Sequence, residues 1–85
     1  MKKVINVGNI YYYNENDVLH REDVPAIELT NGYKSWYKNG KYHREDGPAI
    51  EYANSDKEYF YNGIYYSEIK TNEDWVRFVK LMVFQ

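Results

Sequence analysis

One 23-residue unit is written twice in this chain, and this internal repeat is the strongest constraint on its fold. The stretch HREDVPAIE at residues 20–28 returns as HREDGPAIE at residues 43–51, and 13 of the 23 aligned positions in 20–42 and 43–65 are identical. A repeat of this length holds one supersecondary unit, which buries its apolar face only against its neighbours. We therefore expect a single domain over residues 1–85 built from stacked copies.

Each copy reads as paired β-hairpins, because turn residues separate short runs rich in β-branched and aromatic residues. Asn31-Gly32, Asn39-Gly40 and Asn62-Gly63 are strong signals for two-residue type I′ turns, in which both central residues have positive φ. The expected fold class is mainly β, a single antiparallel meander sheet of hairpin repeats with a C-terminal helix. The expected parts are N-terminal strands with a partial copy (1–19), two repeats (20–42 and 43–66) and the helix (71–84).

Two-residue turns also predict which residues face one another across the strands. Around Asn31-Gly32, Thr30 is expected to face Tyr33 and Ile27 to face Trp36, whereas Trp36 faces His43 around the next turn. The rows expected on one face are Ile27, Trp36 and His43, then Ile50, Tyr59 and Tyr66, and at the start Tyr13 and His20. The other face is expected to carry Tyr37 beside Tyr42, Phe60 beside Tyr65, Asn14 beside Leu19, and also Glu28, Glu51 and Glu58. Both faces are aromatic, so surface remains for a second copy or a partner.

The last part of the chain changes to a helical pattern. Thr71 to Asp74 supplies a capping side chain and acids for the positive end of the helix dipole. Trp75, Phe78, Val79 and Met82 form one helical stripe, while Leu81, Val83 and Phe84 fall outside it. About 12 residues span only ~18 Å, so the helix covers part of one face. A final strand is the alternative.

The composition indicates the cellular compartment of the protein and the kind of partner it binds. The chain has no cysteine, a net charge of −2 and 11 tyrosines. It starts without a signal peptide and has no membrane-length apolar run, so we expect a cytoplasmic protein with no membrane partner. The negative net charge gives no overall electrostatic signal for nucleic-acid binding. Abundant tyrosine is typical of strands and of binding surfaces.

The repeated segments resemble a known family. A 23-residue unit of paired strands with WYKNG and YFYNG, joined by LHREDVPAIE and YHREDGPAIE, is similar to MORN-like repeats seen in small bacteriophage and giant-virus proteins. The resemblance covers about residues 10–66 and implies an extended antiparallel sheet that mediates protein contacts and self-association. If the chain is phage-encoded, the resemblance further implies a host-protein partner, such as a defence or toxin component, that it binds and inhibits.

Histidines beside acids invite a metal or catalytic interpretation. His20 and His43 each precede a Glu and an Asp. Equivalent positions two strands apart lie roughly 10 Å from each other, too far for one ion. We therefore expect both histidines to pack beside aromatic rings. The sequence contains no nucleophile–base set, phosphate loop or ligand cluster, so we expect no enzyme, no metal and no cofactor.

Two further interpretations concern charged residues. Arg21 and Arg44, with Asp23 and Asp46, form either a local ion network or a ligand-facing row. Lys34, Lys38, Lys41 and Lys57 are expected on the Trp36 face, where aromatic rings could stack RNA bases.

The leading hypothesis is a non-enzymatic protein-interaction module, with an RNA-binding factor or a self-assembling module as alternatives. The candidate binding residues are Trp36, His43, Tyr59, Tyr66, Lys34, Lys38, Lys41, Arg21, Arg44, Leu81 and Phe84.

Overall fold

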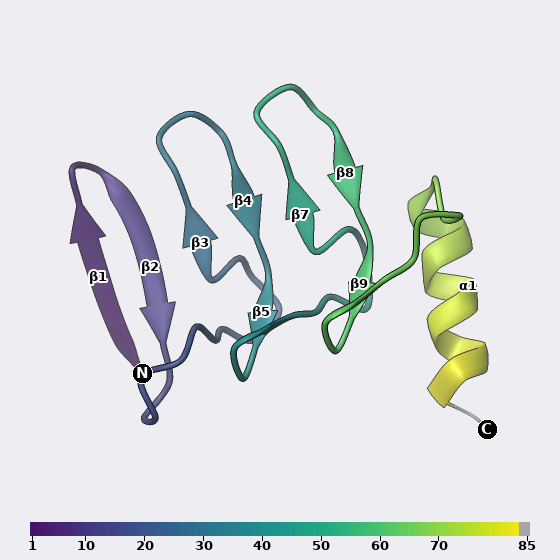
Figure 1. Cartoon of the computed structure of the whole chain (residues 1–85), viewed down its shortest axis with the longest axis horizontal. Helices are drawn as coiled ribbons and strands as arrows, with labels where there is room; N and C mark the ends of the chain where they lie inside the picture. Colours follow the sequence, from purple (N-terminus) through teal and green to yellow (C-terminus); the bar gives the residue numbers. More distant parts are fainter. Residues whose placement is uncertain (84–85) are drawn as a thin grey trace.

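A computed structural model describes residues 1–83 and shows a meander of antiparallel hairpins followed by one helix (Figure 1). The molecule is a slab of 39 × 30 × 16 Å. The expected fold class is confirmed. Six strands form the main sheet in the order β1 (Lys2–Asn6), β2 (Asn9–Tyr13), β3 (Ile27–Glu28), β4 (Lys34–Ser35), β7 (Ile50–Glu51) and β8 (Lys57–Glu58). The remaining elements are β5 (Tyr37–Lys38) with β6 (Lys41–Tyr42), β9 (Phe60–Tyr61) with β10 (Ile64–Tyr65), and α1 (Asn72–Val83).

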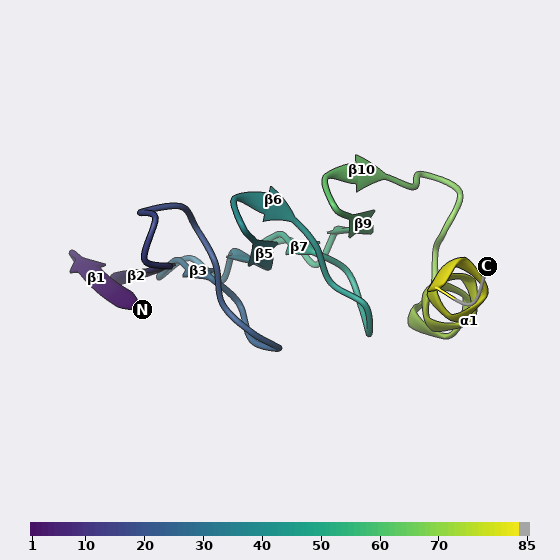
Figure 2. The same ribbon diagram turned by 90° about the horizontal axis from the view of Figure 1, so that it is seen from below.

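Each copy consists of one long hairpin in the main sheet and one short hairpin that turns out of it. Figure 2 shows β5–β6 and β9–β10 projecting to one side of the long hairpins. Backbone bonds tie successive units together: the Gly40 amide donates to the Leu19 carbonyl, and the Gly63 amide donates to the Tyr42 carbonyl, both at 2.8 Å. The repeat thus propagates through main-chain contacts between neighbours.

The short hairpins have the turns that the sequence predicts. Asn39 and Gly40 have φ of 51° and 83°, and Asn62 and Gly63 have φ of 48° and 85°. Lys38 therefore faces Lys41, and the His43 amide donates to the Trp36 carbonyl at 3.0 Å. Positive φ at both central residues matches the right-handed twist of the flanking strands.

The expected register at Asn31-Gly32 is wrong. Only Gly32 has positive φ there (99°), and the Leu29 amide donates to the Tyr33 carbonyl at 2.9 Å, so the loop has three residues. Ile27 therefore faces Ser35 instead of Trp36, and Thr30 does not face Tyr33. Such loops combine a type I turn with a left-handed glycine, and one extra residue turns the following strand over.

The same correction applies to two other loops. Ile50 faces Glu58 instead of Tyr59, because the hairpin bond from the Tyr52 amide to the Asp56 carbonyl closes a three-residue loop. At the start of the chain Tyr13 faces Leu19 instead of His20, while Asn14 bonds to Val18 instead of Leu19. The equivalent facing pairs along the chain are Tyr12 with His20, Trp36 with His43, and Tyr59 with Tyr66.

These registers give the slab two chemically different faces. One is a charged face, on which Glu28, Lys34, Glu51 and Lys57 alternate in sign across four strands. The opposite one, which we call the tyrosine face, carries Tyr33, Tyr37, Tyr42, Tyr52, Phe60 and Tyr65 with Ile27, Ile50 and Glu58. The sequence placed Glu28 and Glu51 on the tyrosine side; the extra loop residue moves them to the other face.

The helix closes the C-terminal end of the charged face. Thr71 Oγ1 accepts the Asp74 amide at 3.1 Å, which is a helix N-cap. Trp75 is completely buried, and its ring lies 5.5 Å from the Tyr59 ring and 5.6 Å from the Tyr66 ring. Val79 completes this core. The predicted stripe thus packs as expected at Trp75 and Val79, while Phe84 lies outside the described residues. Within residues 1–83 there is no helix long and apolar enough to cross a membrane.

Candidate functional site

The aromatic row around Trp36 is covered by other side chains. The Arg44 guanidinium lies 3.8 Å from the centre of the Trp36 ring, and Trp36 is only 7% exposed. The same side chain bonds Asp46 at 2.9 Å, Glu51 at 3.1 Å and the Pro48 carbonyl at 3.2 Å. The expected ion network is therefore present at Arg44, and it leaves this guanidinium few free donors.

The neighbouring units repeat this cover in modified form. In the preceding unit Arg21 lies 3.8 Å from the centre of the Tyr12 ring and bonds the Pro25 carbonyl and Glu28. In the last unit Ser67 stands where the repeat would place an arginine. There the ring of Trp75, from the helix, packs on Tyr59 instead. The row from Tyr12 to Tyr59 is thus capped by Arg, Arg and Trp, which gives it a structural role.

The two histidines tie one unit to the next. His43 Nδ1 accepts the backbone amide of Asn62 at 3.0 Å, and His20 Nδ1 accepts that of Asn39 at 2.9 Å. Their Nε2 atoms lie 3.1 Å from Glu45 and from Glu22. This arrangement uses both ring nitrogens, with Nε2 as the donor in the neutral ring. No group of three or more metal-ligating side chains occurs in the part of the chain that the structure describes.

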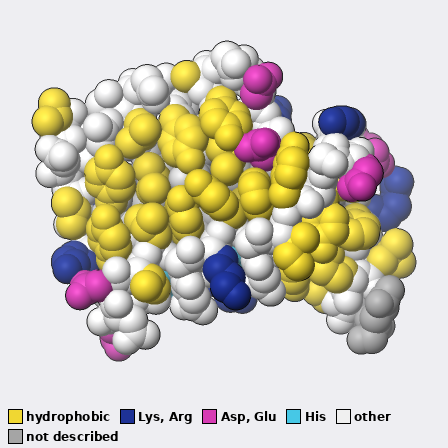
Figure 3. Space-filling view, in the orientation of Figure 1, with side chains coloured by type: hydrophobic (Ala, Val, Ile, Leu, Met, Phe, Trp, Pro, Cys, Tyr) yellow, Lys and Arg dark blue, Asp and Glu magenta, His cyan; other side chains and the backbone are white. Residues whose placement is uncertain are grey.

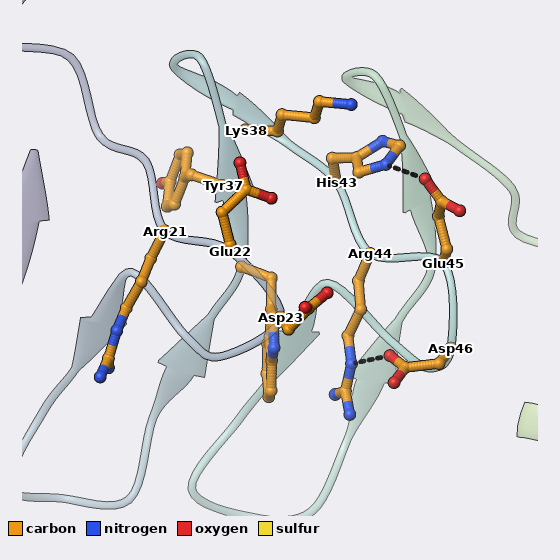
Figure 4. Close-up of a pocket in the computed structure, with 10 residues that line it drawn as sticks. Arg21, Glu22, Asp23, Tyr37, Lys38, His43, Arg44, Glu45 and Asp46 are labelled. Carbon is orange, nitrogen blue, oxygen red and sulfur yellow. Dashed lines mark hydrogen bonds and ion pairs between the residues drawn. The ribbon is translucent and has the colours of Figure 1, made fainter. Parts of the chain in front are cut away.

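A hollow of about 220 Å³ lies between the two HRED segments (Figure 4). Arg21 and Arg44 point the same way in it, and Arg44 reaches Asp46. Four carboxylates line the hollow together with these arginines and Lys38. An anionic ligand would meet those carboxylates, so the charge does not favour a phosphate site here.

The other candidate residues are spread over the surface. Lys38 and Lys41 are exposed at the tip of a short hairpin, and Lys34 lies between Glu28 and Glu51. Tyr66 is half-buried against Trp75 and Phe78. Leu81 is 64% exposed on the helix. The fold therefore brings Trp36, His43 and Arg44 together as an internal cluster and leaves the lysines and Leu81 apart.

The exposed aromatic surface is the tyrosine face. Four rings form a continuous ladder across the short hairpins, with centres 4.6 Å apart between Tyr37 and Tyr42, 4.9 Å between Tyr42 and Phe60, and 5.2 Å between Phe60 and Tyr65. Tyr33 and Tyr52 extend it over the long hairpins with an edge contact at 5.8 Å. Figure 3 shows hydrophobic side chains gathered over the sheet with few charges among them.

Hydroxyl groups and one carboxylate give this face its polarity. The Tyr52 hydroxyl donates to Glu58, and this bond raises the pKa of Tyr52 to about 12. Burial raises the pKa of Tyr33, Tyr37 and Tyr42 above the usual value. Tyr65 and Tyr52 are 49% and 38% exposed. These tyrosines are therefore neutral phenols at neutral pH, and Glu58 adds a carboxylate to the face.

The sequence contains a signal for this surface in the aromatic pairs beside its Asn-Gly turns. Tyr37 beside Tyr42 and Phe60 beside Tyr65 are correctly paired from the Asn-Gly turns. The site was nevertheless placed on the face with the lysines, because cations suggested a ligand. Which aromatic rings remain accessible becomes visible only in three dimensions, where Tyr52 and Tyr65 are exposed while Trp36 and Tyr59 are buried.

Comparison with models of protein families, with curated proteins and with solved structures found no match. The fold and the surface themselves define a class: a β-hairpin repeat protein with one ion-paired face, one exposed aromatic face and a helix that closes one end.

Proposed function

We propose that the protein is a non-enzymatic protein-binding module and that the tyrosine face is its contact surface. The observation that carries this proposal is the ladder from Tyr37 to Tyr65, which is half-buried at its first three rings and exposed at Tyr65. Tyrosine and other aromatic side chains are enriched where proteins bind one another, because they bury large area with few rotatable bonds. A contiguous apolar face on a small protein is also costly unless a partner covers it.

The charge on this face indicates the chemistry of the partner. Glu58 contributes a carboxylate held by Tyr52, and the surrounding rings offer π faces that attract cations. We infer a partner surface that carries arginine or lysine among apolar side chains. Such a surface would pair with Glu58 and stack on Tyr65 or Tyr52. An anionic partner would be repelled by the same carboxylate.

The biological setting is proposed from the sequence resemblance alone. A small phage protein with this surface would bind a host protein in the cytoplasm and block it by occupying a functional surface. RNA binding has less support: the Trp36 and Tyr59 rings are buried, and the lysine row alternates with carboxylates. Inhibition by this route needs no cofactor, metal or catalytic group of the chain itself.

The test is affinity capture from host lysate with matched variants. Wild type, Tyr65→Ser, Glu58→Lys and Leu81→Ser are immobilised in equal amounts, each with and without ribonuclease. The proposal predicts one protein that resists ribonuclease, is retained by Leu81→Ser and is lost with Tyr65→Ser and Glu58→Lys. Glu58→Gln should give an intermediate result, because it removes the charge while it keeps the shape.

A second step excludes indirect capture. The captured protein is purified and titrated with the same variants, and each variant is first shown to be folded by its thermal unfolding. A Kd that rises by about 10-fold or more for Glu58→Lys supports the tyrosine face. Loss of binding in Leu81→Ser alone would move the contact to the helix. A species that disappears with ribonuclease would favour RNA binding instead.

A further inference from the structure

Strand β1 forms a free edge of the sheet. It is a regular five-residue strand whose residues are all exposed, and it pairs with β2 on one side only. Within residues 1–83 no strand lies on its outer side. Val4 and Ile5 are among the exposed large apolar residues. An edge with these properties is a template for another strand.

The hydrogen bonds of β2 determine which groups of β1 point outward. The Tyr12 amide donates to the Ala26 carbonyl, and the Tyr12 carbonyl accepts the His20 amide, so both Tyr12 groups point away from β1. Lys3, which faces Tyr12, therefore directs its own amide and carbonyl outward. Because this direction alternates along a strand, the amide and carbonyl of Ile5 also point outward, while those of Val4 point toward β2.

We propose that β1 pairs antiparallel with β1 of a second copy about a two-fold axis that passes beside Val4. Lys3 then faces Ile5 of the other copy, and each such pair exchanges two backbone bonds, which satisfies four outward groups on each chain. Val4 faces Val4 as a pair without hydrogen bonds. Because Val4 is beside Tyr11 on the tyrosine face, the apolar surface becomes continuous through the dimer.

Charge and the position of the β1–β2 turn favour the axis beside Val4 over an axis beside Lys3 or Ile5. An axis beside Lys3 would put two lysines directly opposite each other, which destabilises a strand pair. An axis beside Ile5 would bring Val7 into the ladder, but Val7 is in the turn with φ of 52°. The axis at Val4 avoids both, and Lys2 faces Asn6 at its ends.

The other end of the sheet explains why assembly stops at two copies. The last strand, β8, has only two residues, and Ser67, Ile69 and Lys70 line a hollow together with Lys57 and Glu58 of that strand. One long free edge and one short edge next to the following segment of the same chain favour a closed, isologous dimer over a filament. This inference does not depend on the proposed binding function of the tyrosine face.

The test uses the absence of cysteine in the native chain. Across a pair without hydrogen bonds the two Cα atoms lie about 4.5 Å apart, within reach of a disulfide. Val4→Cys should therefore give a covalent dimer on mild oxidation. Ile5→Cys is the matched control, since its two copies would be separated by about 8 Å, beyond disulfide reach.

A third variant separates pairing from folding. Lys3→Pro removes an outward amide that makes no bond to β2, so the hairpin should persist while the dimer is lost. Light scattering should show the wild type moving from the 10.3 kDa monomer to twice that mass with concentration. The short interface predicts a Kd of roughly 1–100 µM. A monomer throughout the range, cross-linking through Ile5→Cys instead of Val4→Cys, or a dimer that survives Lys3→Pro would each overturn the proposal.

Discussion

Arg44 lies over the Trp36 ring, with its guanidinium carbon 3.8 Å from the ring centre, and three acceptors hold it there. Arg44 was a candidate ligand-binding residue by its sequence. This contact gives it a structural role instead. Arg44→Ala should lower the free energy of unfolding by about 2–3 kcal/mol, because it removes the stacking and uncovers buried bonds. Urea denaturation measures the loss. Arg77→Ala, on the exposed helix face, should change stability by no more than ~0.5 kcal/mol.

His43 should protect one particular amide. His43→Ala leaves the Asn62 N–H without its acceptor, so we expect a stability loss of about 1–3 kcal/mol. Hydrogen exchange of the Asn62 amide should accelerate by more than the global loss explains. His20→Ala is the internal control, because it should expose the Asn39 amide instead. Equal acceleration at both amides in either variant would argue against this pairing.

Alkaline pH should destabilise the fold through its tyrosines. The pKa values of Tyr33, Tyr37, Tyr42 and Tyr59 are raised by burial, and that of Tyr52 is raised to about 12 by Glu58. The folded state therefore keeps protons that the unfolded chain releases near pH 10. The contribution of these tyrosines to the free energy of unfolding should be fully present below pH 10 and be lost as the pH rises through 12.

Glu58→Gln isolates the Tyr52 contribution. Without the carboxylate, the pKa of Tyr52 should move back toward 10, and the pKa values of Tyr33 and Tyr42, to which Glu58 adds a smaller contribution, should fall slightly. Absorbance titration of the phenols measures this directly. An unchanged titration curve would mean that Glu58 does not hold the Tyr52 hydroxyl.

The β1–β2 turn contains a residue that is poorly suited to it. Val7 has φ of 52° in a type I′ geometry with Gly8, and a β-branched side chain is strained there. Val7→Asn should raise the free energy of unfolding by about 0.5–1.5 kcal/mol. The reverse change at the equivalent turn position, Asn39→Val, should lower it by a similar amount. Thermal unfolding of both variants tests the assignment of the turns.

The repeat and its turns could be predicted from the sequence, while the complete register could not. Asn39-Gly40 and Asn62-Gly63 adopt the turn that their residues favour. Asn31-Gly32 has the same letters but forms a three-residue loop, since the Leu29 and Tyr33 backbones bond across it. Local sequence permits both loops, and the loop that forms decides whether Ile27 faces Ser35 or Trp36.

The candidate site was harder to predict for a related reason. Histidine, arginine and tryptophan commonly bind ligands, so the sequence favours Trp36, His43 and Arg44 as site residues. Their roles are set by partners from other units, namely Arg44 over Trp36 and Asn62 against His43. Exposure is a property of the assembled slab, and only there do the rings from Tyr37 to Tyr65 form a ladder that ends at the exposed Tyr65.

Site-specific photo-crosslinking tests the central claim most directly. A benzophenone side chain is placed at Tyr65 on the tyrosine face, at Lys38 on the short hairpin tip or at Leu81 on the helix, and each protein is irradiated in host lysate. If the tyrosine face is the contact surface, one host protein is cross-linked from position 65 and not from position 38 or 81. Cross-linking of that protein from position 38 or 81 alone would contradict it.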